Sequence, residues 1–183
     1  MDENMSSDIV LRFVNTHADA GGRRELFGTA REFADWAVAH ELLSADAVVT
    51  ESDAAAAREL RDALITVLLA HAGDPAPGLP EAEKYLAQAG ARYPLTAVVT
   101  VHGARLRPAS QGVPGVLGGV LAAVAEAAQG DTWRRLKACC NPPCHFGFVD
   151  RSRNRSGRFC SPGCSSQTSM RALRQRRKKA GPR

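Results

Sequence analysis

The sequence has no cysteine in its first 138 residues, so cysteine chemistry is confined to the C-terminal part. Aromatic residues make up only 5% of the chain, and abundant alanine favours helices packed with small side chains. No apolar run approaches the roughly 20 residues that a transmembrane helix needs, so a membrane-spanning protein is not expected. The N-terminus lacks the basic region and apolar stretch of a signal peptide, so secretion is not expected either.

Motifs of the common enzyme classes are also absent. The sequence shows no nucleophile elbow, phosphate-binding loop or His-Glu metal motif. Four of its five histidines, His17, His40, His71 and His102, are scattered rather than grouped. We therefore expect a protein that is not an enzyme.

Length and charge indicate two parts. The 183 residues suffice for one medium domain and a small module. Residues 1–130 contain 10 Lys and Arg against 17 Asp and Glu, a charge of −7, whereas residues 131–183 contain 14 against 2, a charge of +12. We predict domains 1–130 and 131–183, with a polyanion as partner of the second. A disordered solubilising tail is the alternative.

Residues 1–130 are predicted to be mostly helical with a small antiparallel β-hairpin, an α+β fold. Thr29 and Glu32 form a candidate capping box, and Ser52 or Asp53 is expected to cap a longer helix to about Ala72. The other expected elements are a short apolar segment over 9–16, a loop over 17–24, a helix over 81–88, strands over 95–101 and 104–107, and a buried helix over 115–128. No flexible linker precedes the second part, so the two are expected to pack together.

Four of the five cysteines form two close pairs, Cys139 with Cys144 and Cys160 with Cys164. Two cysteines on a tight turn supply one edge of the tetrahedron that zinc prefers. A chain without an export signal is expected in a reducing cytoplasm, where thiolate ligation is favoured over disulfides. Cys140 and His145 offer alternative ligands, and free cysteines in a small apolar patch remain a further alternative.

The module around these cysteines has few large apolar side chains, so it needs one structural zinc ion and contact with the helical part to fold. The expected order is a zinc knuckle, a β-hairpin over 146–159, then Cys160 and Cys164 at a helix N-terminus with Pro162 in its first turn. This order is that of a treble clef. Asp150 is the one acidic residue between the pairs, so a catalytic zinc is not expected.

Four segments of this module closely resemble the CGNR zinc-finger family: residues 133–139, 141–144, 148–154 and 159–161. The segment 11–16 and the later order of helices with an inserted hairpin look like an ABATE domain. The resemblance implies a predicted bacterial transcription regulator with an N-terminal stress- or ligand-responsive α+β domain. In the family register the zinc ligands are Cys139, Cys144, Cys160 and Cys164.

The chain departs from this family at the last ligand, where Cys164 precedes Ser165-Ser166-Gln167 instead of Gly-Asn-Arg. All thiolates remain, so zinc binding is expected to survive. Arg171 is the candidate to replace the charge of the missing arginine.

The second part carries many candidate nucleic-acid contacts. Arg171, Arg174 and Lys178 fall on one face of the last helix, with Met170 and Leu173 expected to face the body. The full candidate set is Arg151, Arg153, Arg155, Arg158, Arg171, Arg174, Arg177 and Lys178. Double-stranded DNA is the expected partner of a cytoplasmic, nucleoid-associated regulator. An RNA- or ribosome-associated module is the alternative, in which Phe146 and Phe148 stack on bases.

The sequence says less about a small-molecule effector. Arg12, Asn15 and Thr16 are candidate ligand-binding residues, and local turn capping by Asn15 and Thr16 is the competing interpretation. The sequence leaves open whether the chain forms a homo-oligomer.

Overall fold

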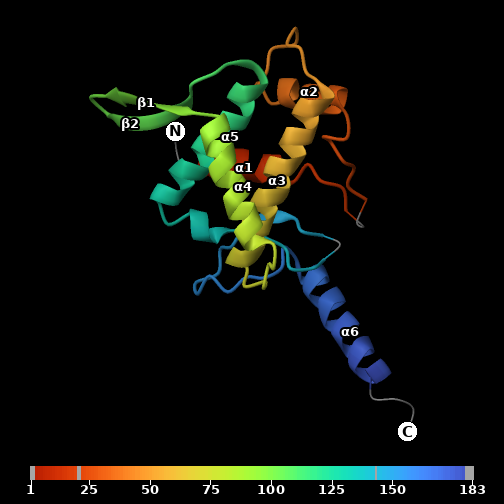
Figure 1. Ribbon diagram of the computed structural model, residues 1–183. Coiled ribbons are helices and arrows are strands. Elements are labelled where there is room, and N and C mark those ends of the chain that lie inside the picture. The colour runs from red at the N-terminus through yellow and green to blue at the C-terminus, as the bar shows by residue number, and fades with distance from the viewer. Residues whose placement is uncertain (1–2, 20–21, 143, 180–183) are drawn as a thin grey trace.

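A computed structural model describes residues 3–19, 22–142 and 144–179 of the chain (Figure 1). The first domain contains α1 (Glu3–Val14), α2 (Ala30–Ala39), α3 (Glu51–His71), α4 (Leu79–Arg92), β1 (Leu95–Thr100), β2 (Gly103–Pro108) and α5 (Gly112–Gln129). A short 3-10 turn (Trp133–Arg135) leads to β3 (Leu136–Ala138), β4 (Gly147–Val149) and α6 (Pro162–Lys179). The architecture is therefore α+β, as predicted.

The core lies between α1, α3 and α5, which contact one another. The apolar segment of the N-terminus is helical, because Val10, Phe13 and Val14 recur at helical spacing and are fully buried. Phe27 lies 5.4 Å from Phe13 and 5.0 Å from Phe33, ring centroid to ring centroid. Four of the ten Phe, Trp and Tyr residues thus pack together between α1 and α2: Phe13, Phe27, Phe33 and Trp36.

Helix caps agree in part with the sequence patterns. Thr29 is the N-cap of α2, and its hydroxyl accepts the N–H of Glu32 at 3.2 Å, as predicted. The predicted cap of α3 was wrong, because Thr50 has the extended backbone of an N-cap and Asp53 is the third helical residue of its capping box. The helix predicted over 81–88 is longer, since α4 starts at Leu79 and continues to Arg92.

The β1–β2 hairpin matches the predicted strands, with Leu95 opposite Pro108 and Thr100 opposite Gly103. It projects from the helical body as a two-stranded ribbon (Figure 1). β2 and α1 both pack on α5. Among the described residues α5 is the one helix long and apolar enough to cross a membrane; 44% of it is buried within the protein, where Leu117, Val120 and Ala123 belong to the core.

The strands of the second part differ from the prediction. A hairpin within residues 146–159 was expected, but β4 pairs with β3, with Leu136 opposite Val149 and Ala138 opposite Gly147. Residues after Asp150 instead fold around a buried ion pair, described below. Leu136 and Ala138 belong to the same buried core as α1, α3 and α5, so the two parts pack together as expected.

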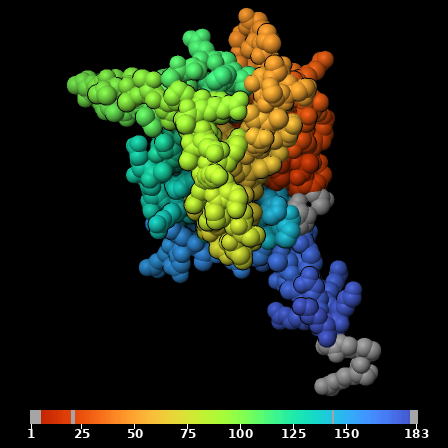
Figure 2. Space-filling view, in the orientation of Figure 1, coloured from red at the N-terminus to blue at the C-terminus, as the bar shows by residue number. Residues whose placement is uncertain are grey.

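The helix α6 extends away from the rest of the molecule (Figures 1 and 2). None of its described residues is buried. The expectation that Met170 and Leu173 face the body was wrong, because their exposed fractions are 49% and 40%. Arg171, which lies between them in the sequence, contacts the body instead by donating to Asn141 Oδ1.

Candidate metal centre and nucleic-acid interface

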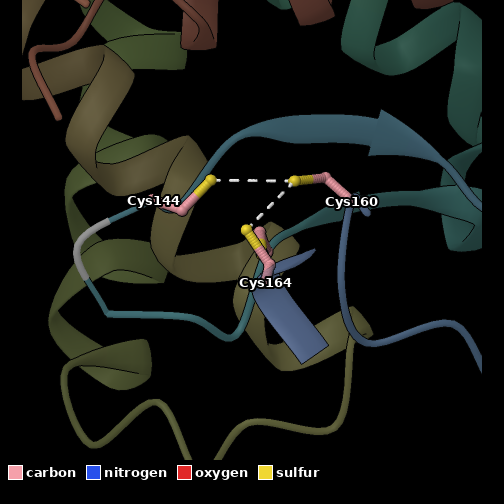
Figure 3. A group of neighbouring side chains, drawn as sticks. Cys144, Cys160 and Cys164 are labelled. Carbon is pink, nitrogen blue, oxygen red and sulfur yellow. Dashed lines mark hydrogen bonds between the residues drawn. The ribbon is translucent and has the colours of Figure 1, made fainter. Parts of the chain in front are cut away.

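The Sγ atoms of Cys139, Cys144, Cys160 and Cys164 all lie within 4.8 Å of one another. Cys160 Sγ is 3.7 Å from both Cys144 Sγ and Cys164 Sγ, and these three side chains converge (Figure 3). Zinc–sulfur bonds of about 2.3 Å in a tetrahedron place two sulfurs about 3.8 Å apart. All five cysteines are free of disulfides. The four sulfurs therefore fit one zinc ion.

Local structure brings these cysteines together from three segments. Cys139 directly follows β3, and its N–H donates to Phe146 O at 3.0 Å. Cys144 closes the turn after Asn141, donating its N–H to Asn141 O at 2.7 Å. Cys160 precedes α6 and Cys164 lies in its first turn, as predicted. Zinc here is structural, since all four tetrahedral positions are provided by thiolates.

The electrostatics of the cluster call for a cation. Burial raises the pKa of the Cys160 thiol, so its thiolate needs a compensating charge. Burial opposes ionisation of Cys164 too, but hydrogen bonds from the side chains of Asn141 and Ser161 lower the pKa of Cys164 to about 7. A zinc ion stabilises the thiolate form of all four cysteines.

The two alternative ligands lie outside this group of four. Cys140 is buried, and its thiol donates to Ala72 O of the first domain at 3.7 Å. His145 directly follows Cys144 in a left-handed backbone conformation, with φ of 47°. Cys140 thus contributes to packing between the two parts.

A buried ion pair organises the loop that follows β4. Lys137 Nζ donates to Asp150 Oδ2 at 2.7 Å and to Gly157 O at 3.0 Å. Asp150 Oδ1 and Oδ2 accept the backbone N–H groups of Ser152 and Gly157. The loop therefore curls around the carboxylate, which explains why residues 146–159 do not form the predicted hairpin. The sequence indicated neither the burial of Lys137 nor its pairing.

A second polar contact fixes α6 to the zinc knuckle, the turn from Cys139 to Cys144. Asn141 is 1% exposed, and its side-chain amide donates to Gln167 Oε1 at 3.0 Å. Arg171 donates to Asn141 Oδ1, so both ends of this amide bind α6. The first three turns of α6 are thus held at Cys164, Gln167 and Arg171, the last two through Asn141. In the sequence, the position of Asn141 before two prolines predicted only a turn.

Comparison with protein families agrees with this geometry. The family ABATE, described as "Putative stress-induced transcription regulator", matches residues 7–132, and the CGNR zinc finger matches residues 135–177. The chain belongs to the ABATE family. A comparison with curated proteins found no match.

The CGNR finger of this ABATE protein lacks the Gly-Asn-Arg after its last cysteine. Gln167 stands at the arginine position and binds Asn141. Arg171 lies one helical turn further along α6 and reaches the same amide. A guanidinium is therefore present beside the knuckle, supplied from the next turn.

The predicted nucleic-acid residues of the ABATE protein have different surroundings. Arg151 and Arg153 are exposed on the loop around Asp150, whereas Arg155 pairs with Asp131. Arg158 lies over Phe159, 6.0 Å from the ring centroid. On α6 the exposed residues are Arg174, Arg177 and Lys178, and Arg171 is half-buried against Asn141.

The ABATE domain contacts the finger through the end of α1 and the loop after it. Asn15 forms two hydrogen bonds with Gly147, donating to its O at 3.0 Å and accepting its N–H at 2.7 Å. His17 Nε2 lies 2.8 Å and Arg23 Nη2 lies 2.5 Å from Cys144 O. The packing is close, since a Cβ on Gly147 would lie 2.6 Å from Val14 Cγ2.

These contacts involve residues that were predicted to bind ligands. Asn15 binds the finger, and Thr16 donates its hydroxyl to Phe13 O at 2.7 Å. Arg12 is exposed and pairs with Asp8 at 2.7 Å. Arg12 also borders a hollow of about 40 Å³, scarcely more than the volume of one water molecule. The side chains of Asn15 and Thr16 therefore form hydrogen bonds within the protein itself.

The aromatic residues considered for RNA stacking are also engaged. Arg23 lies over the Phe146 ring, 4.8 Å from its centroid, and Phe148 is half-buried in β4. A base cannot stack on a ring face that a guanidinium covers. Arg23 thus links Phe146 to the ABATE domain, while 36% of this residue remains exposed.

Proposed function

We propose that this protein is a transcription regulator whose finger binds duplex DNA and whose ABATE domain responds to a small ligand. The carrying observation is the exposure of α6, which presents Arg174, Arg177 and Lys178 to solvent along a helix clear of the body (Figure 2). Its 18 residues span about 27 Å at 1.5 Å per residue. A major groove about 12 Å wide admits such a helix.

Charge supports a defined orientation on DNA. Residues 1–130 carry −7 and residues 131–183 carry +12, so the ABATE domain repels the phosphate backbone while the finger attracts it. The exposed Arg151 and Arg153 lie on the same finger as α6, on a loop that the buried Lys137–Asp150 pair supports. DNA is therefore expected to approach the finger end of the molecule.

The test uses the zinc-loaded chain with a selected duplex, a scrambled duplex and a structured RNA at matched salt. About six phosphate contacts give a slope near −5 in log K against log salt. Replacing Lys178 by Ala is expected to weaken binding to both duplexes equally, while Arg174→Ala also reduces the preference between them.

The matched control is Lys84→Ala, which removes an exposed lysine from α4 of the ABATE domain. It is expected to leave DNA affinity unchanged. Equal affinity for both duplexes contradicts a sequence-specific regulator, and a preference for the RNA favours the RNA-associated alternative. An equal loss in Lys84→Ala and Lys178→Ala would show that only total charge matters.

A further inference from the structure

An apolar pocket of about 140 Å³ lies in the ABATE domain, between β2, α5 and α1. Its apolar lining is provided by four segments: Ile9 of α1, Leu42 of the loop after α2, Leu106 and Pro108 of β2, and Val116 and Val120 of α5. A cavity of about 150 Å³ with such a lining holds a benzene ring. The pocket therefore matches a six-carbon ring or a branched chain of similar size.

Gly119 of α5 keeps part of this pocket open. A Cβ added there would contact only Pro108 Cγ, at an ordinary 3.8 Å, so packing of the backbone does not require glycine at this position. Glycine in a helix interior destabilises it by about 1 kcal/mol relative to alanine. The effect of Gly119 that the structure does show is the space it leaves beside Val120 and Leu106.

Two arginines of β2, Arg105 and Arg107, border the same pocket and are exposed. No hydrogen bond or ion pair joins either guanidinium to another of the described residues, although the ABATE domain is acidic overall. Other arginines of this domain, such as Arg12, Arg23 and Arg61, form ion pairs with carboxylates. Arginine binds a carboxylate through two parallel N–H donors.

We propose that this pocket binds a small organic monocarboxylate with a ring-sized apolar body. The apolar group occupies the space beside Gly119, and Arg105 and Arg107 hold the carboxylate at the mouth. The proposal deepens the sensory part of the proposed function and rests on it, but it does not depend on DNA binding. Its test is therefore made without DNA.

The test titrates the zinc-loaded chain with benzoate, using NMR to follow the backbone amides of residues 116–122. Benzyl alcohol supplies the same ring without the charge, and acetate supplies the charge without the ring. Benzoate is expected to bind at least about 10-fold more tightly than either, because charge-assisted hydrogen bonds and ring burial both contribute. Equal affinity for the three probes, or no benzoate binding at millimolar concentration, would overturn the proposal.

Variants locate the site. Gly119→Leu fills the pocket and favours the helix, so it is expected to keep the fold and abolish benzoate binding. Gly90→Leu is the matched control, since Gly90 is an exposed residue of α4 with open space around it. Arg105→Gln and Arg107→Gln are each expected to weaken benzoate binding about 10-fold, whereas Arg31→Gln, which changes an exposed residue of α2, leaves it unchanged. Unaltered binding by Gly119→Leu or by both β2 variants would contradict this assignment.

Discussion

Lys137 and Asp150 bring opposite charges into the interior of the finger, where their exposed fractions are 2% and 3%. Burial alone would raise the pKa of Asp150, but hydrogen bonds from Lys137, Ser152 and Gly157 hold this pKa well below its usual value. A carboxyl with a lowered folded pKa stabilises the fold above its unfolded pKa, near 3.9, and loses that contribution as the pH falls below it. At neutral pH the contribution is complete.

Removing one partner of this pair is expected to destabilise the finger strongly. Lys137→Met leaves a buried carboxylate without its counter-charge, so we expect a loss of about 3 kcal/mol in the free energy of unfolding. The double variant Lys137→Met, Asp150→Asn should recover part of this loss, since it leaves no buried charge. Urea titrations monitored by zinc release measure both, at pH 7. Equal stability of the wild type and Lys137→Met would contradict a role for the pair.

At the scale of elements, α6 depends on its attachment to Asn141 as well as on zinc. Asn141→Ala removes the partner of both Gln167 and Arg171. The half-buried guanidinium of Arg171 then loses this acceptor, and we expect the anchoring of α6 to weaken by about 1–2 kcal/mol. Hydrogen exchange of the α6 amides measures this effect.

Arg171→Ala is expected to give the same faster exchange in α6, whereas the exposed Arg174→Ala should leave it unchanged. This pair of variants separates anchoring from DNA contact. Faster exchange in Arg174→Ala alone would contradict the attachment through Asn141, because the side chain of Asn141 bonds to Gln167 and Arg171.

The success of sequence patterns depended on how local each interaction is. Thr29 and Pro162 mark helix starts through contacts within one turn, and the strands of residues 95–107 are joined by a tight turn, so local patterns predicted them. The four cysteines were found because their spacing follows the demands of zinc. Contacts between residues far apart in the sequence leave no local pattern. Asn141 binds Arg171, 30 residues away, and Asn15 binds Gly147, 132 residues away.

The predicted finger hairpin failed for the same reason. Residues 146–149 have an apolar pattern that fits a strand, but that pattern does not say which segment pairs with it. β3 is the partner because Leu136 and Ala138 complete the core shared with the ABATE domain. Pairing within residues 146–159 would have left Lys137 without the loop that binds its ammonium group.

At the scale of the whole molecule, the shared core predicts the response to zinc removal. Chelation in reducing buffer is expected to unfold residues 139–179, because few apolar side chains hold them without metal. The helices α1 to α5 should remain, so circular dichroism at 222 nm should fall by about the share that α6 contributes. Loss of contacts around Leu136, fully buried beside α3, should also lower the melting temperature of the ABATE domain. Complete unfolding on chelation would contradict this division.

A single helix, α1, contacts the apolar pocket and strand β4 of the finger and gives the molecule a route for regulation. Ile9 lines the apolar pocket, and Asn15, directly after the last residue of α1, forms two hydrogen bonds with Gly147 of the finger. A ligand that shifts α1 must change these bonds, and linkage requires DNA to alter ligand affinity by the same factor.

We expect saturating benzoate to change DNA affinity at least about 5-fold in the wild type, the lower end of typical coupling. Asn15→Ala should retain both binding events but reduce their coupling to less than about 2-fold, whereas Asn154→Ala, on the exposed finger loop, should retain it. Fluorescence anisotropy of labelled duplex, with and without benzoate, measures the two DNA affinities of each protein, and their ratio is the coupling. Full coupling in Asn15→Ala would show that the signal does not pass through the end of α1.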